Sequence, residues 1–268
     1  MPNLIRDGVR LHYEDEGGSG APLVLHTGGA GSGAMWRDGG YVERLSEFRV
    51  ILYDHRGRGR SDRPPQRASH APDDYIADVM ALADELGLAG YGFFGYSFGG
   101  AVGYLLALRD PRVCALAVLG TVFDPPDEQA LPSDYAAPVM EDGMEGLVDA
   151  VEQGEGLTLP GWLREDFGAT DPQQFGLTLE GWAAEPDPWP RLGEIRVPVA
   201  LVAGALEDPD RTQDEMAAAM PDATSTRVPG AGHVGAFLQP DAVVEAVLPA
   251  LRRGADKPLR RTGRRLEP

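Results

Sequence analysis

The sequence has little cysteine, little lysine and no long apolar run. Among its 268 residues, Cys114 is the only cysteine and Lys257 the only lysine. A single cysteine excludes an internal disulfide, and its place in the apolar run Val113–Leu119 predicts a buried thiol on a strand. No run approaches the roughly 20 apolar residues that span a bilayer, and residues 1–7 lack the basic-then-apolar pattern of a secretion signal. We therefore expect a cytoplasmic protein with no membrane partner.

Positive charge is also scarce, and it is unevenly placed. The formal net charge of −18 argues against nucleic acid as a partner. The last 17 residues, from Arg252 to Pro268, nevertheless contain six arginines and Lys257 and carry a net charge of +5. This end has almost no apolar content, so we predict that residues 254–268 form a disordered basic tail.

Short apolar runs alternate with amphipathic stretches along most of the chain. A mostly parallel sheet covered by helices on both faces produces this alternation. Between residues 122 and 196 it stops, and prolines, acidic residues and tryptophans replace the strand-like runs. This segment is too long for an ordinary loop, so we predict a small helical cap over the carboxyl edge of the sheet. Residues 1–121 and 197–253 then form the core.

Residues 95–100 read Gly-Tyr-Ser-Phe-Gly-Gly, which is a G-x-S-x-G motif. The apolar run Tyr91–Phe94 precedes it, and the helix-like run Ala101–Leu108 follows it. A strand, a sharp turn that carries a serine, and a helix form the context in which this motif presents a nucleophile. We predict that Ser97 is that nucleophile; the alternative is a glycine-serine turn without chemistry.

A serine hydroxyl needs a base, and the base needs an acid to orient it. His233 follows a Gly-x-Gly turn after the last predicted strand and lies beyond Ser97 in the sequence, which makes it the predicted base. His26 and His55, at strand ends, are its competitors. For the acid we predict Asp208, after the penultimate strand, because it completes the order serine, acid, histidine. The alternatives that remain open are Glu207 and Asp124.

The negative oxygen that forms when a serine attacks a carbonyl needs two N–H donors. One is predicted to be the backbone N–H of Phe98, next to the nucleophile. The other comes from the glycine-rich loop after the first buried strand, from Gly29 or Gly28.

Residues 54–62 form an arginine-rich segment, Asp-His-Arg-Gly-Arg-Gly-Arg-Ser-Asp. It lacks the G-K-[ST] of a phosphate-binding loop and does not open a helix, so a nucleotide site is not indicated. We predict a rigid turn held by Asp, Arg and Ser hydrogen bonds.

Up to Leu251 the chain resembles the α/β-hydrolase superfamily. The matching stretches are Gly28-Gly29 with Trp36, residues 54–61, residues 95–100, Asp208-Pro209 and Gly232-His233. The resemblance implies an α/β-hydrolase fold, an eight-stranded mostly parallel sheet flanked by helices, with Ser97, His233 and Asp208 as its triad. Thr27 stands where the family usually has histidine, and a serine nucleophile argues against the haloalkane dehalogenase and epoxide hydrolase branches.

The predicted function is a serine hydrolase that cleaves a small or medium ester or lactone through an acyl-enzyme on Ser97, without metal or organic cofactor. The small-molecule acyl substrate is its only predicted partner, and the oligomeric state is left open. Alternatives with the same triad are a carbon–carbon bond hydrolase, a proline-iminopeptidase-like peptidase and a cofactor-free perhydrolase; another class is a non-catalytic ligand-binding protein. The predicted pocket residues are Tyr96, Trp36, Trp162 and Trp182, with Phe167 and Phe175 as further candidates from the cap.

Overall fold

The computed structural model describes residues 2–123, 136–182, 187–207 and 212–256. Eight strands form one sheet in the order β1-β2-β4-β3-β5-β6-β7-β8. The pairs β1–β2 and β2–β4 are antiparallel, and the remaining pairs are parallel. The strands are β1 (Asn3–Arg6), β2 (Val9–Gly17), β3 (Pro22–His26), β4 (Arg49–Tyr53), β5 (Tyr91–Tyr96), β6 (Val113–Leu119), β7 (Val199–Gly204) and β8 (Ala223–Val228).

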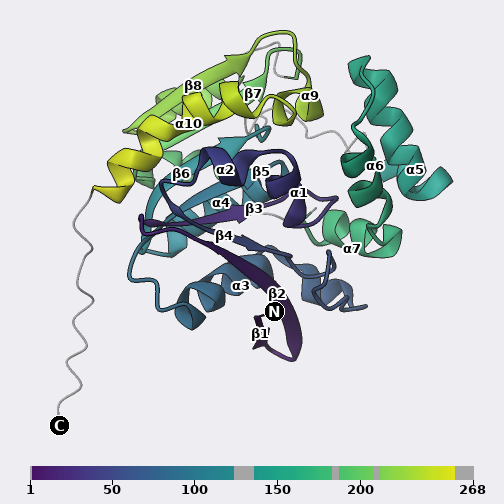
Figure 1. The fold of residues 1–268 in the computed structure, drawn as a ribbon, viewed down its shortest axis with the longest axis horizontal. Helices are drawn as coiled ribbons and strands as arrows, with labels where there is room; N and C mark the ends of the chain where they lie inside the picture. Colours follow the sequence, from purple (N-terminus) through teal and green to yellow (C-terminus); the bar gives the residue numbers. More distant parts are fainter. Residues whose placement is uncertain (1, 124–135, 183–186, 208–211, 257–268) are drawn as a thin grey trace.

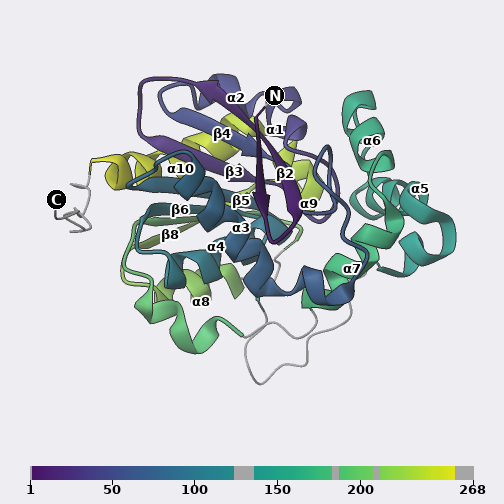
Figure 2. The ribbon, with the colours of Figure 1, turned by 90° about the horizontal axis from the view of Figure 1, so that it is seen from below.

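Helices cover both faces of this sheet, as the alternation of strands and helices predicts (Figures 1 and 2). One face packs against α1 (Ala34–Asp38), α2 (Tyr41–Arg44), α9 (His233–Phe237) and α10 (Pro240–Ala255). The other face packs against α3 (Pro72–Glu85), α4 (Phe98–Arg109) and α8 (Thr212–Ala219), together with the short 3₁₀ helix η2 (Trp189–Glu194). A second 3₁₀ helix, η1 (Arg67–His70), precedes α3.

The central strands are buried on both faces because helices lie on both sides of them. Leu23, Val24 and Leu25 of β3 are fully buried. Leu23 and Leu25 belong to one hydrophobic core cluster, and Val24 belongs to the other. Such strands read as continuous apolar runs rather than as alternating patterns. The carboxyl ends of the parallel strands meet at one edge, where the loops after β3, β5 and β7 come together.

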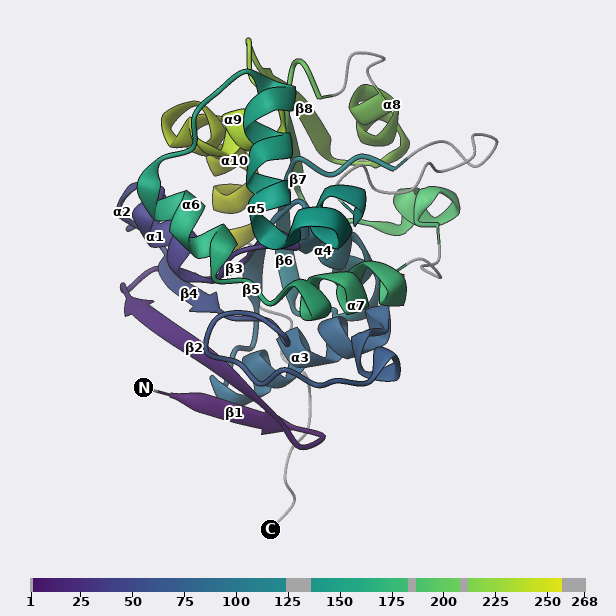
Figure 3. The same cartoon turned by 90° about the vertical axis from the view of Figure 1, so that its right-hand side faces the viewer.

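Three helices lie between β6 and β7, in the segment predicted to be a helical cap. They are α5 (Ala136–Glu155), α6 (Gly161–Gly168) and α7 (Pro172–Trp182). They group together beside the sheet, and Figure 3 looks onto them. The 3₁₀ helix η2, which follows these helices, packs against α4 and α8 on one face of the sheet. Among the described residues, none of the helices has both the length and the apolar character needed to cross a bilayer.

The end of α10 and the cysteine differ from the sequence predictions. Helix α10 continues to Ala255, so residues 254 and 255 belong to the folded core rather than to a tail. Gly254 is buried where α10 crosses β6, and a Cβ there would lie 2.5 Å from the Cβ of Ala115. Cys114 lies on β6 as predicted but is half-buried rather than buried, and its thiol donates to the Arg112 carbonyl at 3.3 Å. Residues 257–268 of the predicted tail lie outside the described residues.

Candidate active site

Ser97 occupies a sharp turn between β5 and α4. Its backbone has φ 53° and ψ −121°, a left-handed conformation that a non-glycine residue adopts only at a cost. The flanking glycines are required by close backbone approach: a Cβ on Gly95 would lie 2.1 Å from the Gly99 carbonyl oxygen, and one on Gly99 would lie 2.4 Å from that of His26. The N–H of Gly100 donates to the Ser97 carbonyl at 2.7 Å and begins the helix. The turn therefore has the strained strand-to-helix geometry that the motif predicts.

His233 begins α9 and is held by a carboxylate. Its Nδ1 lies 2.5 Å from Oε1 of Glu207, and its ring stacks on that of Tyr96 with 5.0 Å between centroids. Because Nδ1 is bonded to Glu207, Nε2 is the ring nitrogen that can accept a proton from a nucleophile. Gly120 passes beside the ring with φ +65°, and a Cβ there would lie 2.9 Å from Nδ1.

The pKa of His233 lies above its usual value, and the pKa of Glu207 lies below its usual value. Burial by itself lowers the pKa of His233, but the charge and hydrogen bond of Glu207, with a contribution from Glu155, outweigh burial and raise it above its usual value. For Glu207, burial opposes ionisation, yet the interaction with His233 and a hydrogen bond from Gly204 leave its pKa below the usual value. Glu207 is therefore ionised at neutral pH and stabilises the imidazolium form of His233.

The carboxylate that contacts His233 among the described residues is Glu207, one of the alternatives to the predicted Asp208. Glu207, one residue earlier and one methylene longer, forms the hydrogen bond to Nδ1. It also lies close to Gly204, whose N–H donates to its second oxygen at 3.3 Å. Asp208 and the other alternative, Asp124, lie outside the described residues. The sequence offered both neighbours, but spacing along one short loop does not reveal which side chain turns inward.

The competing histidines at the strand ends are structural. His26 and His55 are fully buried and stack on each other, with 5.0 Å between ring centroids. Burial lowers the pKa of His26 to about 4 and that of His55 well below its usual range. Both rings are thus neutral at neutral pH, and Nδ1 of His26 donates to the Thr27 carbonyl at 2.8 Å. Thr27 is also fully buried.

The glycine-rich loop after β3 lies against the serine. A Cβ on Gly28 would lie 3.2 Å from Cβ of Ser97 and 3.6 Å from its Oγ. Nε2 of His55 lies 3.1 Å from the Gly28 carbonyl oxygen, and Nε of Arg58 donates to that of Gly29 at 2.6 Å. Phe98 is the first residue of α4, so its N–H has no partner within the helix. These groups lie where the predicted oxyanion donors are expected.

Ser97 and His233 open into the same cavity, which has a volume of about 210 Å³. Its floor is polar and its walls are apolar. Apart from His233 and the phenol of Tyr96, no described lining residue carries an ionisable side chain. The lining residues are Gly28, Gly29, Ala30, Tyr96, Ser97, Phe98, Leu147, Val151, Phe167, Phe175, Leu179, His233 and Val234.

The pocket predictions are correct for some aromatic residues and wrong for others. Tyr96, Phe167 and Phe175 line the cavity. Trp36 does not: it is fully buried in the core beside Tyr41, Phe94 and Phe237. Trp162 packs on the outside of the same core cluster. Trp182 is not among the lining residues; it packs edge-on against Phe98, which does line the cavity, with 4.7 Å between ring centroids. Large aromatic side chains fill a core as readily as a pocket, so composition alone did not separate them.

A family model of the alpha/beta hydrolase fold matches residues 21–173. The chain belongs to the alpha/beta hydrolase family. It is 29% identical over 256 residues to a Bacillus subtilis (strain 168) protein with the provisional name 2-succinyl-6-hydroxy-2,4-cyclohexadiene-1-carboxylate synthase, a match that covers 88% of this chain and 92% of that one. It is 40% identical over 122 residues to the non-heme chloroperoxidase of Streptomyces lividans, covering 44% and 43%. The crystal structure of the enol-lactonase from Burkholderia xenovorans LB400 superposes with a TM-score of 0.78 at 28% identity, covering 94% and 100%. The named relatives are enzymes, which supports an enzymatic role for this chain.

In this alpha/beta hydrolase, α5, α6 and α7 are each hydrogen-bonded to a loop of the site. Glu155 of α5 accepts the N–H groups of Val234 and Gly235, next to His233, at 2.7 and 2.8 Å. Helix α7 contacts the arginine-rich turn through Thr178, which accepts from Arg58 at 3.2 Å. These contacts were not predictable from the sequence because they join residues far apart in the chain.

Helix α6 and the turn that follows it hold the glycine-rich loop through one side chain each. Asp166 accepts the N–H and the hydroxyl of Ser32 at 2.8 and 2.7 Å. Thr170, just beyond the end of α6, accepts the N–H of Gly31 at 3.0 Å. Because Thr170 lies outside the helix, no helical spacing in the sequence could have suggested the pair.

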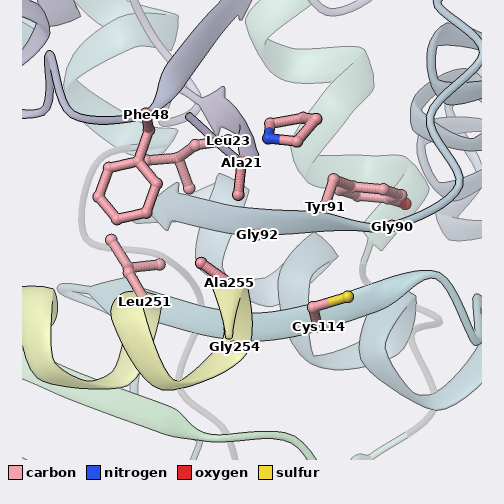
Figure 4. Close-up of a pocket in the computed structure, with 11 residues that line it drawn as sticks. Ala21, Leu23, Phe48, Gly90, Tyr91, Gly92, Cys114, Leu251, Gly254 and Ala255 are labelled. Atoms are coloured by element: carbon pink, nitrogen blue, oxygen red, sulfur yellow. The ribbon is translucent and has the colours of Figure 1, made fainter. Parts of the chain in front are cut away.

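A second cavity of the alpha/beta hydrolase lies at the opposite, amino ends of β3, β5 and β6 (Figure 4). Phe48 and Leu251 face each other across it, and Cys114 lies at its side. No described lining residue there is charged. The described residues also include no group of three or more His, Cys, Asp or Glu side chains that could hold a metal ion. Ser97, His233 and Glu207 therefore form the candidate catalytic group.

Proposed function

We propose that the protein is a serine hydrolase that cleaves a small or medium ester or lactone through an acyl-enzyme on Ser97. The observation that carries the proposal is the cavity that Ser97 and His233 share, with a carboxylate against the far nitrogen of the histidine. A nucleophile, a base and an acid in this relation are the minimum set for acyl transfer. The similarity to an enol-lactonase along nearly the whole of both chains adds support for an ester-type bond.

In the first half of the proposed reaction, Ser97 attacks the substrate carbonyl and its proton passes to Nε2 of His233. Glu207 stabilises the resulting imidazolium, and N–H groups of Phe98 and of Gly29 or Gly28 stabilise the oxyanion. As the tetrahedral intermediate collapses, the bond to the leaving oxygen breaks and His233 gives that oxygen its proton. In a lactone this alcohol stays attached to the acyl group.

In the second half, His233 removes a proton from water, and the resulting hydroxide attacks the acyl carbon. The bond to Ser97 breaks, its oxygen takes the proton back, and the acid product leaves. The walls contributed by α5, α6 and α7 are apolar, with Leu147, Val151, Phe175 and Leu179 among them. Such walls favour an uncharged, apolar acyl group of modest size.

An active-site-directed fluorophosphonate tests the nucleophile. We expect the wild-type protein to be labelled and the Ser97→Ala variant to remain unlabelled while it keeps its fold by circular dichroism. Absence of labelling on folded wild-type protein would contradict the serine hydrolase proposal and favour a ligand-binding role.

A chain-length series of nitrophenyl esters, together with small lactones, tests the substrate class. We expect the highest kcat/KM for short to medium acyl chains, because the cavity is small. Labelling of Ser97 without turnover of any member would shift the proposal to a carbon–carbon bond hydrolase, a proline-iminopeptidase-like peptidase or a cofactor-free perhydrolase. Each of these is then assayed with its own substrate.

A further inference from the structure

Arg58 is a fully buried arginine in the turn of residues 54–62. Its guanidinium donates three hydrogen bonds to neutral oxygens: from Nε to the Gly29 carbonyl at 2.6 Å, from one terminal nitrogen to the Gly57 carbonyl at 3.1 Å, and from the other to the Thr178 hydroxyl at 3.2 Å. The guanidinium also lies 5.9 Å from the centre of the Phe175 ring. Gly29 and Phe175 both line the cavity of Ser97.

The positive charge of Arg58 has no ion-pair partner among the described residues. Arg56, two positions earlier and equally buried, shows the usual arrangement, since Asp78 receives hydrogen bonds from two of its nitrogens at 2.7 Å. Burial lowers the pKa of Arg58 to about 10, so the side chain is still a cation at neutral pH. A buried cation without a counter-ion is costly, and such a group is a candidate for a functional role.

Arg58 and His55 lie against two consecutive peptide groups of the glycine-rich loop. Nε of Arg58 donates to the Gly29 carbonyl, and Nε2 of His55 faces the Gly28 carbonyl at 3.1 Å, while Nδ1 of the same neutral ring faces the Arg56 carbonyl at 3.1 Å. In a trans peptide the N–H points away from the carbonyl of the same group. The N–H groups of Gly29 and Ala30 are consequently turned away from the buried turn, and both residues line the cavity.

We propose that Arg58 is a positioning residue that orients the oxyanion loop and whose buried charge stabilises the negative oxygen formed at Ser97. This inference rests on the proposed hydrolase function. The charge acts through the Gly29–Ala30 peptide group, whose carbonyl Arg58 holds and which directly follows the Gly28–Gly29 peptide, rather than by contact with substrate. A cation in surroundings of low dielectric constant interacts strongly with charge that develops nearby. The anionic tetrahedral state therefore gains more from Arg58 than the neutral substrate does.

The test compares Arg58→Met and Arg58→Lys with a matched control, Arg60→Met, whose side chain belongs to the same turn but is 51% exposed. We expect kcat of Arg58→Met to fall about 10- to 1,000-fold with KM changed less than threefold. Arg58→Lys keeps the charge but loses the planar fork, so its kcat should lie between those of wild type and Arg58→Met. Arg60→Met should retain wild-type kcat.

A boronic acid inhibitor separates this role from simple stabilisation of the fold. Boronic acids form a tetrahedral anion on a serine, whereas the product alcohol binds as a neutral ligand. We expect the inhibition constant of phenylboronic acid to rise at least tenfold in Arg58→Met. The inhibition constant of the neutral product alcohol should change less than threefold. If Arg58→Met does not fold, the change in the boronic acid inhibition constant relative to that of the product alcohol is measured on Arg58→Lys instead. A larger change for the boronic acid then supports the role of Arg58, and equal changes contradict it.

Unchanged kcat and unchanged boronate affinity in folded variants would overturn the role of Arg58. Equal weakening of boronate and alcohol would also overturn it, because loss of pocket shape affects both ligands alike. Failure of the hydrolase proposal itself is recognised separately, by the absence of Ser97 labelling and turnover in the wild-type protein.

Discussion

At the scale of the residue, His233 is the group on which most of the electrostatics of the site converges. Glu207 bonds its Nδ1, Glu155 contributes negative charge from α5, and Tyr96 stacks on its ring. The two carboxylates raise the pKa of His233 against the opposing effect of burial. A base accepts protons only in its neutral form, so activity should rise as the pH increases through this pKa.

Replacing Glu207 by Gln removes the largest contribution that raises the pKa of His233. We expect kcat to fall about 10²- to 10⁴-fold, because the imidazolium loses its counter-charge and the imidazole its fixed tautomer. The acid limb of the kcat/KM profile should move to lower pH. A pH–rate profile measures both effects. Asp208→Asn is the comparison, and a larger loss there than in Glu207→Gln would overturn the assignment of the acid.

Replacing Glu155 by Gln removes a charge and keeps an acceptor for only one of the N–H groups of Val234 and Gly235, because these donate to different oxygens of the carboxylate. The acid limb should again shift to lower pH, by less than in Glu207→Gln, and kcat should stay within about tenfold of wild type. The control is Glu145→Gln, an exposed residue of the same helix. An acid limb that does not move, or one that moves equally in the control, would show that Glu155 does not act on His233.

At the scale of the element, α6 is the clearest case of a helix that serves a loop. Asp166 of this helix and Thr170, just after its end, accept the backbone N–H groups of Ser32 and Gly31, while Phe167 of α6 lines the cavity. Gly31 has φ +84°, and a Cβ there would lie 2.7 Å from Asp166. The glycine is thus needed both for its conformation and for the close approach of α6.

The double substitution Asp166→Ala and Thr170→Val should release the glycine-rich loop from α6. We expect kcat/KM to fall about tenfold or more, since an oxyanion donor that is not held in place stabilises the transition state less. Steady-state kinetics with a nitrophenyl ester measures this effect. Glu165→Ala, an exposed neighbour on α6, serves as the control. Kinetics equal to wild type in the double variant would mean that the loop is held without α6.

How far the sequence determined each element depended on the range of its contacts. The strand, turn and helix around Ser97 were predictable because glycine positions and apolar runs act locally. The Asp54–Asp62 turn was predicted as a hydrogen-bonded unit, and Asp54 does accept from the N–H groups of Gly33 and Arg60. The orientation of Glu207 and the burial of Trp36 depend on residues more than twenty positions away, which no local pattern encodes.

At the scale of the whole molecule, a buried ion network joins three separate parts of the chain. Asp78 of α3 receives hydrogen bonds from Arg56 in the turn after β4 and from Arg6 of the edge strand β1. Asp78 is fully buried and Arg56 nearly so. The network fixes the antiparallel β1–β2 hairpin to the parallel part of the sheet, and with it the turn that carries Arg58.

Removing Arg56 should leave the carboxylate of Asp78 buried with only Arg6 to compensate it. We expect Arg56→Met to lower the free energy of unfolding by about 3–5 kcal/mol. Urea denaturation followed by circular dichroism measures the loss. Arg253→Met, which breaks an exposed pair with Asp222, should cost less than about 1 kcal/mol. Similar losses in the two variants would indicate that the buried network contributes no more than a surface pair.

The hydrogen bonds between the inserted helices and the loops of the site affect how the protein can be re-engineered. An insertion that only formed a lid could be exchanged for that of a relative to obtain a new substrate range. Here Glu155, Asp166 and Thr178 each contact a different loop beneath them. A chimera that received foreign helices would lose these bonds together, and its chemistry would weaken along with its selectivity. Productive transplants must carry the matching loops with the helices, so the insertion and the loops are best treated as one inherited unit.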